Sequence, residues 1–299
     1  MIVVYHQYFL IMGACNLKCK YCFYETGMLN YAGTRIKPAD VHRWLAHYTN
    51  ESILKSVTFT GGEPLLRRDI IDFIEVSQVY TDDVGIITNG TLITQDLAEI
   101  FRDKNIEVHV SLDSITSDYH ERTRGQMKET LKGLETLASS NVKRKSITCV
   151  LSSENIDQVI DLIDFATNLG FSINFSPISV DKENKLSLSK ISKEAKLTLM
   201  QNLNEWAKKN NKEYYLGLIS FILKGFNVPK LSNCTFTNNS IVIDSDGSIY
   251  PCYQHKESKQ YKLGNIKESK ISEVREKREI FMKLTKPASC IKEGCLGVF

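Results

Sequence analysis

The chain has 299 residues, of which 42% are hydrophobic and 24% charged, an ordinary globular composition that allows one large domain or one domain with a small appendage. Its 38 basic and 35 acidic residues are intermixed, so no basic block indicates a nucleic-acid interface. Without a signal-peptide pattern or an apolar run of about 18 residues, we expect a cytoplasmic protein that does not enter the membrane. In that reducing compartment, eight cysteines indicate metal ligands rather than disulfides.

Short β-branched runs alternate with segments of helical period through the first part of the chain. The predicted strands, in chain order, cover residues 8–14, 56–60, 84–88, 106–112, 146–151 and 171–175. The predicted helices cover residues 38–47, 69–79, 94–101, 127–138 and 155–169, with Thr94 as an N-cap. Strands and helices that alternate in this way form parallel sheets through right-handed crossovers, so we predict an α/β fold, either doubly wound or a barrel.

Three cysteines, Cys15, Cys19 and Cys22, follow the first predicted strand within eight residues. A disulfide takes cysteines in pairs, whereas zinc and ordinary electron-carrying iron–sulfur clusters take four protein ligands. The next cysteine along the chain is Cys149, so a four-iron cluster on this loop would keep one iron free to bind a substrate. Three buried thiols in a reduced protein are the alternative interpretation of the same spacing.

Polar and glycine-rich segments come directly after the next three predicted strands. They are Gly61-Gly62-Glu63-Pro64, Thr88-Asn89-Gly90 and Ser111-Leu112-Asp113. Each alone is a common turn or helix cap. In parallel α/β folds, however, reactive residues gather at the C-terminal ends of the strands, so we expect these segments to meet the cysteines at one end of the sheet.

The order of these motifs resembles the core of radical S-adenosylmethionine (SAM) enzymes over roughly residues 7–176. The resemblance implies a partial (β/α)6 TIM barrel and a [4Fe-4S] cluster held by Cys15, Cys19 and Cys22. It implies that the open iron chelates the amino and carboxylate groups of SAM. Reductive cleavage would give methionine and a 5′-deoxyadenosyl radical that abstracts a substrate hydrogen atom. The electron needed for this reductive cleavage implies a flavodoxin- or ferredoxin-type donor.

The same resemblance assigns SAM contacts residue by residue. Tyr21 occupies the position that packs near adenine, the Gly-Gly-Glu-Pro segment contacts the methionine amino group, and the Ser-Leu-Asp segment lies near the ribose hydroxyls. A solvated loop charge is the alternative interpretation of Arg124. The complete implied set is Tyr21, Gly61, Gly62, Glu63, Pro64, Asn89, Ser111, Asp113 and Arg124.

The character of the chain changes after residue 176. Beyond a polar, irregular stretch, helices are predicted over residues 191–209 and 214–226, the second covering the barrel mouth or lining the substrate pocket. Two short apolar runs flank Asp244-Ser245-Asp246-Gly247, which predicts a hairpin. A polar helix is predicted around residues 271–284. We expect a core barrel, a helical linker and a small C-terminal domain, over residues 1–180, 181–230 and 231–299.

Four further cysteines, Cys234, Cys252, Cys290 and Cys295, form two pairs near the C-terminus. Four thiols suit a structural zinc or a four-iron cluster. The C-x12-G-x4-C stretch resembles the start of the SPASM and twitch extensions of radical SAM enzymes, which carry auxiliary iron–sulfur clusters. A full SPASM domain would need seven cysteines, so the twitch form, with one auxiliary [4Fe-4S] cluster, fits better.

Cys149 falls in the fifth predicted strand. The simplest interpretation is a small buried hydrophobe. If its thiol faces the barrel lumen instead, Cys149 is a candidate hydrogen-atom donor to a substrate radical.

Two enzymatic functions and one non-catalytic function follow from the resemblance. The first is modification of a ribosomally synthesised peptide by epimerisation or cross-link formation. Because the cluster motif begins at Cys15, a separate leader-peptide-binding protein or the catalytic domain itself would recognise the leader. The second is oxidation or epimerisation of a carbohydrate or aminocyclitol. The third is a non-catalytic iron–sulfur protein, against which the SAM-site motifs argue.

Overall fold

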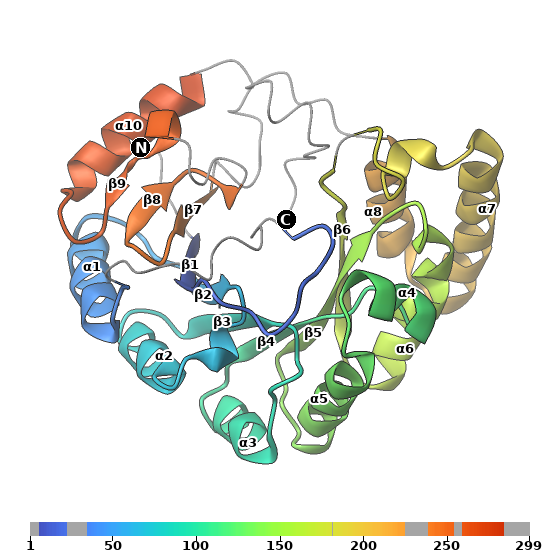
Figure 1. Cartoon of the computed structure of the whole chain (residues 1–299), viewed down its shortest axis with the longest axis horizontal. Coiled ribbons are helices and arrows are strands. Elements are labelled where there is room, and N and C mark those ends of the chain that lie inside the picture. The colour runs from blue at the N-terminus through green and yellow to red at the C-terminus, as the bar shows by residue number, and fades with distance from the viewer. Residues whose placement is uncertain (1–5, 23–34, 181, 225–238, 254–258, 284–299) are drawn as a thin grey trace.

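The computed structural model describes residues 6–22, 35–180, 182–224, 239–253 and 259–283. Within these ranges, one nine-stranded sheet has the order β6-β5-β4-β3-β2-β1-β7-β8-β9. Strands β1 to β6 pair in parallel, and helices line the outside of their curve (Figure 1). Because β6 and β9 are the two edges, the sheet curves without closing. The predicted partial (β/α)6 barrel is confirmed.

The barrel strands are those predicted, with ends displaced by one or two residues. The strands are β1 (His6–Met12), β2 (Ser56–Gly61), β3 (Asp83–Thr88), β4 (Glu107–Ser111), β5 (Lys145–Leu151), β6 (Ser172–Pro177), β7 (Ser240–Ile243), β8 (Ser248–Tyr250) and β9 (Gly264–Asn265).

The predicted helices are also present. The helices are α1 (Pro38–Glu51), α2 (Ile70–Gln78), α3 (Gln95–Asp103), α4 (Ser117–Thr123), α5 (Met127–Ser139), α6 (Val159–Asn168), α7 (Lys193–Asn210), α8 (Glu213–Lys224) and α10 (Ile271–Lys283). Thr94 caps α3 as predicted, because its hydroxyl accepts a hydrogen bond from Leu97 N at 3.3 Å. Helix α1 runs a turn beyond its predicted end because Tyr48 continues its buried face. No helix in the described ranges is long and apolar enough to cross a membrane.

The strand register separates an outer face of the sheet from an inner one. Phe9, Phe59 and Ile86 lie side by side on β1, β2 and β3, and the ring of Phe59 packs against Phe73 of α2 with centroids 5.6 Å apart. This face is therefore the one that the helices cover. Side chains alternate along a strand, so Thr58 and its register neighbours face the barrel lumen.

The C-terminal strands continue the barrel sheet. Strand β7 pairs in parallel with β1, and Val242 lies beside Tyr8. The predicted hairpin is confirmed, since Val242 also pairs with Tyr250 across the antiparallel β7–β8 ladder. Helix α10 is fixed to α1 by Arg275, which donates hydrogen bonds to Glu51 O and Ser52 Oγ. The domain boundaries expected near residues 180 and 230 stay predictions.

Candidate active site

The cysteine loop leaves β1 at the C-terminal end of the parallel strands. Its backbone is folded tightly, with Cys22 N donating to Cys19 O at 3.2 Å and Leu17 N donating to Cys15 Sγ at 3.4 Å. Lys20 N donates to Thr123 O at 2.9 Å, which fixes the loop to the end of α4. Hydrogen bonds therefore fix both the first and the second half of the loop that carries the thiols.

The three thiols fit an iron–sulfur cluster. Burial raises the pKa of Cys15 and raises the pKa of Cys19 to about 11, and the neighbouring thiols add to both increases. Deprotonating such thiols requires a cation beside them, which iron supplies. In the described ranges, no three His, Cys, Asp or Glu side chains converge as a single metal ion requires. A cubane cluster needs no such convergence, because each thiolate binds a different iron.

The Gly-Gly-Glu-Pro segment packs directly on this loop. Gly62 N donates to Met12 O at 2.6 Å, and Glu63 N donates to Ala14 O at 2.9 Å. A Cβ atom at Gly62 would overlap the Ala14 carbonyl, so only glycine allows this approach. Pro64 opens a short 3-10 helix (Pro64–Leu66) that turns the chain away from the site.

Glu63 joins the second and third motifs. Its fully buried carboxylate accepts hydrogen bonds from Leu65 N at 3.0 Å, from the Thr88 hydroxyl at 2.7 Å and from Asn89 N at 2.8 Å. Burial raises the pKa of Glu63 to about 6, and the three donors limit that increase, so the carboxylate is ionised at pH 7. Its contact with the SAM amino group stays a prediction.

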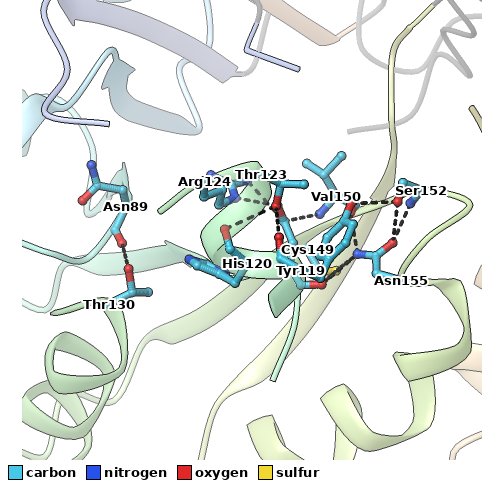
Figure 2. A network of polar contacts seen from close by, with 11 residues as sticks. Asn89, Tyr119, His120, Thr123, Arg124, Thr130, Cys149, Val150, Ser152 and Asn155 are labelled. Atoms are coloured by element: carbon cyan, nitrogen blue, oxygen red, sulfur yellow. Dashed lines mark hydrogen bonds and ion pairs between the residues drawn. The ribbon is translucent and has the colours of Figure 1, made fainter. Parts of the chain in front are cut away.

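Arg124 forms a buried ion pair with Asp113 (Figure 2). Its Nε lies 2.6 Å from Asp113 Oδ2 and its Nη2 3.3 Å from Oδ1, while Val150 N donates to Oδ1 at 2.8 Å. The Asp113 side chain is 0% exposed and that of Arg124 is 10% exposed. The interpretation of Arg124 as a solvated loop charge is therefore wrong. The predicted contact of Asp113 with ribose stays a prediction.

Most of the predicted SAM residues are gathered around this pair and the cysteine loop. The ring of Tyr21 lies 5.4 Å from the Arg124 guanidinium, and half-buried Ser111 ends β4. Asn89 turns its side-chain amide toward the cysteine loop, 3.9 Å from Cys15 Sγ. Sequence reasoning missed Asn16, the asparagine that contacts this amide. Its place between two cluster cysteines was the available signal.

Cys149 faces the helices. It lies beside Phe175 in the β5–β6 register, and the ring of Phe175 packs against Tyr215 of α8 with centroids 6.3 Å apart. The thiol is fully buried and donates to Asp113 O at 3.8 Å. A hydrogen-atom donor must reach the lumen, so the predicted donor role of Cys149 is wrong, and Cys149 is a small buried hydrophobe.

Cys252 lies on the opposite, inner face. It is buried against Leu10 and Val242 in a small cluster that Tyr8 and Tyr253 complete. The other predicted auxiliary ligands, Cys234, Cys290 and Cys295, lie outside the described residues.

Comparison with protein families decides the affiliation of the chain. The family described as the Radical SAM superfamily matches residues 9–166, which is more than half of the chain. The chain belongs to the radical SAM superfamily. A second family, SPASM, described as an iron-sulfur cluster-binding domain, matches residues 234–295, the range that contains all four C-terminal cysteines.

Curated relatives of this radical SAM protein include GTP 3′,8-cyclases. The enzyme of Helicobacter pylori strain HPAG1 is 28% identical over 254 residues, covering 82% of this chain and 78% of its own length. That of Clostridium perfringens strain 13 is 29% identical over 260 residues, covering 81% and 78%. Native anSMEcpe with bound AdoMet has a TM-score of 0.74 at 22% identity, covering 95% of this chain and 84% of that one. Streptococcus suis SuiB bound to precursor peptide SuiA has a TM-score of 0.70 at 19% identity, covering 100% and 71%. These structures share the fold.

In a radical SAM enzyme, SAM and an iron–sulfur cluster together supply a radical that abstracts hydrogen. Here Cys15, Cys19 and Cys22 would hold that cluster. The remaining residues of the site hold the loops that surround it: Glu63 connects the second and third motifs, and Asp113 fixes Arg124 beside Tyr21. These contacts between protein side chains hold the loops of the site in position.

Proposed function

We propose that this radical SAM enzyme modifies a peptide, by epimerisation or by cross-link formation. The observation that carries the proposal is the chemistry of the inner barrel face. Ser111, Thr148 and Asn174 lie side by side across β4, β5 and β6, with Val150 and Ser176 in the next inward row. The hydroxyls and the amide are neutral groups that both donate and accept hydrogen bonds, as a peptide backbone does.

Strands β5 and β6 contribute no basic side chain to the inner face that could bind a polyphosphate. The inward positions of β5 and β6, as the register gives them, are Ser146, Thr148, Val150, Ser172, Asn174 and Ser176, with no lysine or arginine among them. Arg124, beside the cysteine loop, is already paired with Asp113. Binding of phosphates relies on arginine, lysine or a metal ion. The inward side chains of β5 and β6 therefore suit a neutral substrate better than a nucleoside triphosphate.

Two structural neighbours contain peptides. One is native anSMEcpe with bound AdoMet and Cp18Cys peptide, with a TM-score of 0.72, and the other is SuiB with its precursor peptide SuiA. Their shared fold supports the proposal of a peptide substrate. The proposal includes a flavodoxin- or ferredoxin-type reductant, and a separate leader-peptide-binding protein or the catalytic domain itself for leader recognition.

The proposal also includes a second [4Fe-4S] cluster at Cys234, Cys252, Cys290 and Cys295. The burial of Cys252 on the inner face of β1 and β7 supports a site beside the lumen. Four cysteines ligate such a cluster completely, which favours electron transfer or structural support over substrate binding.

Cyclisation of a nucleoside triphosphate is the second candidate, because the GTP 3′,8-cyclases match the chain over 82% of its length. Oxidation or epimerisation of a carbohydrate or aminocyclitol has weaker support, from BtrN in complex with AdoMet and 2-DOIA, at a TM-score of 0.51.

The candidates are separated by one set of assays. The chain is reconstituted anaerobically, reduced, and incubated in deuterated buffer with SAM and either GTP or any short peptide encoded beside its gene. We expect a peptide to stimulate 5′-deoxyadenosine formation. The peptide should become lighter by a pair of hydrogen atoms if it is cross-linked, or gain a solvent deuterium if it is epimerised. Consumption of GTP with equal formation of 5′-deoxyadenosine would reject the peptide proposal in favour of cyclisation.

A further inference from the structure

Three side chains from two loops form a closed ring of hydrogen bonds beside Cys15. Asn16 Nδ2 donates to Thr91 Oγ1 at 2.8 Å, the Thr91 hydroxyl donates to Asn89 Oδ1 at 2.7 Å, and Asn89 Nδ2 donates to Asn16 Oδ1 at 2.8 Å. Each donor meets an acceptor, so the ring fixes the direction in which both amides point. Asn16 belongs to the cysteine loop, whereas Asn89 and Thr91 follow β3.

The ring holds one amide against a cluster ligand. Asn89 Nδ2 lies 3.9 Å from Cys15 Sγ, on which Leu17 N also converges at 3.4 Å. The backbone of Asn89 is fixed as well, because its N–H donates to Glu63 Oε2 at 2.8 Å and its carbonyl accepts from Thr130 Oγ1 at 3.0 Å (Figure 2). The Asn89 amide is therefore held from both its backbone and its side chain.

We propose that Asn16 and Thr91 are positioning residues that aim the Asn89 amide at Cys15 and thereby raise the reduction potential of the cluster bound there. An N–H directed at a cysteine sulfur stabilises the negative charge that the cluster gains on reduction. Hydrogen bonds to the sulfurs are one of the means by which a protein sets this potential. These contacts lie at the cysteine loop, so their effect on the cluster does not depend on which substrate the enzyme modifies.

The test compares two substitutions at one position. Thr91→Val removes the hydroxyl and opens the ring at nearly constant volume, whereas Thr91→Ser keeps the hydroxyl and is the matched control. Both reconstituted variants are titrated potentiometrically, and the signal that SAM perturbs identifies the relevant cluster. We expect Thr91→Val to shift its potential to a more negative value and Thr91→Ser to stay at the wild-type potential. Iron loss to a chelator should be faster in Thr91→Val, on the order of tenfold.

Equal potentials and equal iron loss in the wild type and both variants would overturn the proposal. Circular dichroism and the signal of the second cluster report whether Thr91→Val is folded. If it is not, Asn16→Ala opens the same ring from the cysteine loop, and an unchanged potential in that variant rejects the proposal equally.

Discussion

Replacing Asp113 by asparagine tests the central ion pair of the site. Asparagine has nearly the same shape but a single oxygen acceptor. If that oxygen keeps the hydrogen bond from Val150 N, the new NH2 group faces the Nε–H of Arg124. Both groups are hydrogen-bond donors, so neither finds an acceptor in the other. Arg124 then stays buried as an unpaired cation, because its side chain is only 10% exposed.

The expected loss is large for a single substitution. Removing one partner of a buried ion pair costs roughly 3–5 kcal/mol, whereas an exposed pair contributes about 0.2–1 kcal/mol. Helix α4, whose C-cap is Arg124, offers the control: Asp118→Asn removes an i,i+4 pair with Arg122 whose two side chains are 82% and 41% exposed. We therefore expect Asp113→Asn to lower the free energy of unfolding by about 3 kcal/mol and Asp118→Asn to lower it far less.

Urea unfolding of the apoprotein, followed by circular dichroism, measures both variants under identical conditions. Added salt should reduce the effect of Asp118→Asn and leave that of Asp113→Asn nearly unchanged, because salt screens exposed charges and hardly reaches buried ones. If Asp113→Asn loses no more stability than Asp118→Asn, the pair is not the constraint described above, and Asp113 is free for the predicted ribose contact.

Gly62→Ala should displace the cysteine loop and weaken SAM binding, as measured by calorimetry. Gly217→Ala is the control, because it lies in α8 with open space around its Cβ. It should raise the free energy of unfolding, measured with urea, by about 0.5–1 kcal/mol. Alanine at the three cluster cysteines should abolish SAM cleavage and lower the iron content from about eight to about four per chain, and retained cleavage would reject that assignment. Burial lowers the pKa of His120, next to Asp113, Arg124 and Glu121. Below pH 6.5 the unfolded chain therefore binds a proton at His120 more readily than the folded chain does. The free energy of unfolding should decrease as the pH is lowered below 6.5, and it should decrease less in His120→Phe.

The barrel strands and the hairpin were predictable because their signals are local. Six β-branched runs determine the strands, and the motifs that follow the first four of them determine the end of the sheet at which these motifs meet. The hairpin follows from Asp246-Gly247 between two apolar runs, and Gly247 adopts a φ of 90°. These elements depend on neighbouring residues, so the sequence determines them without knowledge of the tertiary fold.

The orientation of Cys149 required long-range information. Thr148, Cys149 and Val150 are all compatible with either face of a strand, and only the pairing with β6 places Cys149 beside Phe175 on the helix side. Helix α4 was missed for a related reason. It is short and polar, and it is held by the burial of Tyr119 and His120 rather than by a periodic apolar face. Because α4 was not predicted, the pairing of Arg124 with Asp113 could not be predicted either.

The polar contacts of the site connect one motif to the next. Glu63 joins the second motif to the third, the ring at Asn16 joins the third to the first, and Arg124 joins the Ser-Leu-Asp segment to α4, which holds the cysteine loop. We expect such a frame to orient SAM in the same way whatever the substrate is. We then expect selection between substrates to depend on the inner face of β4 to β6. The sequence similarity to GTP 3′,8-cyclases and the fold shared with peptide-bound enzymes are therefore compatible observations.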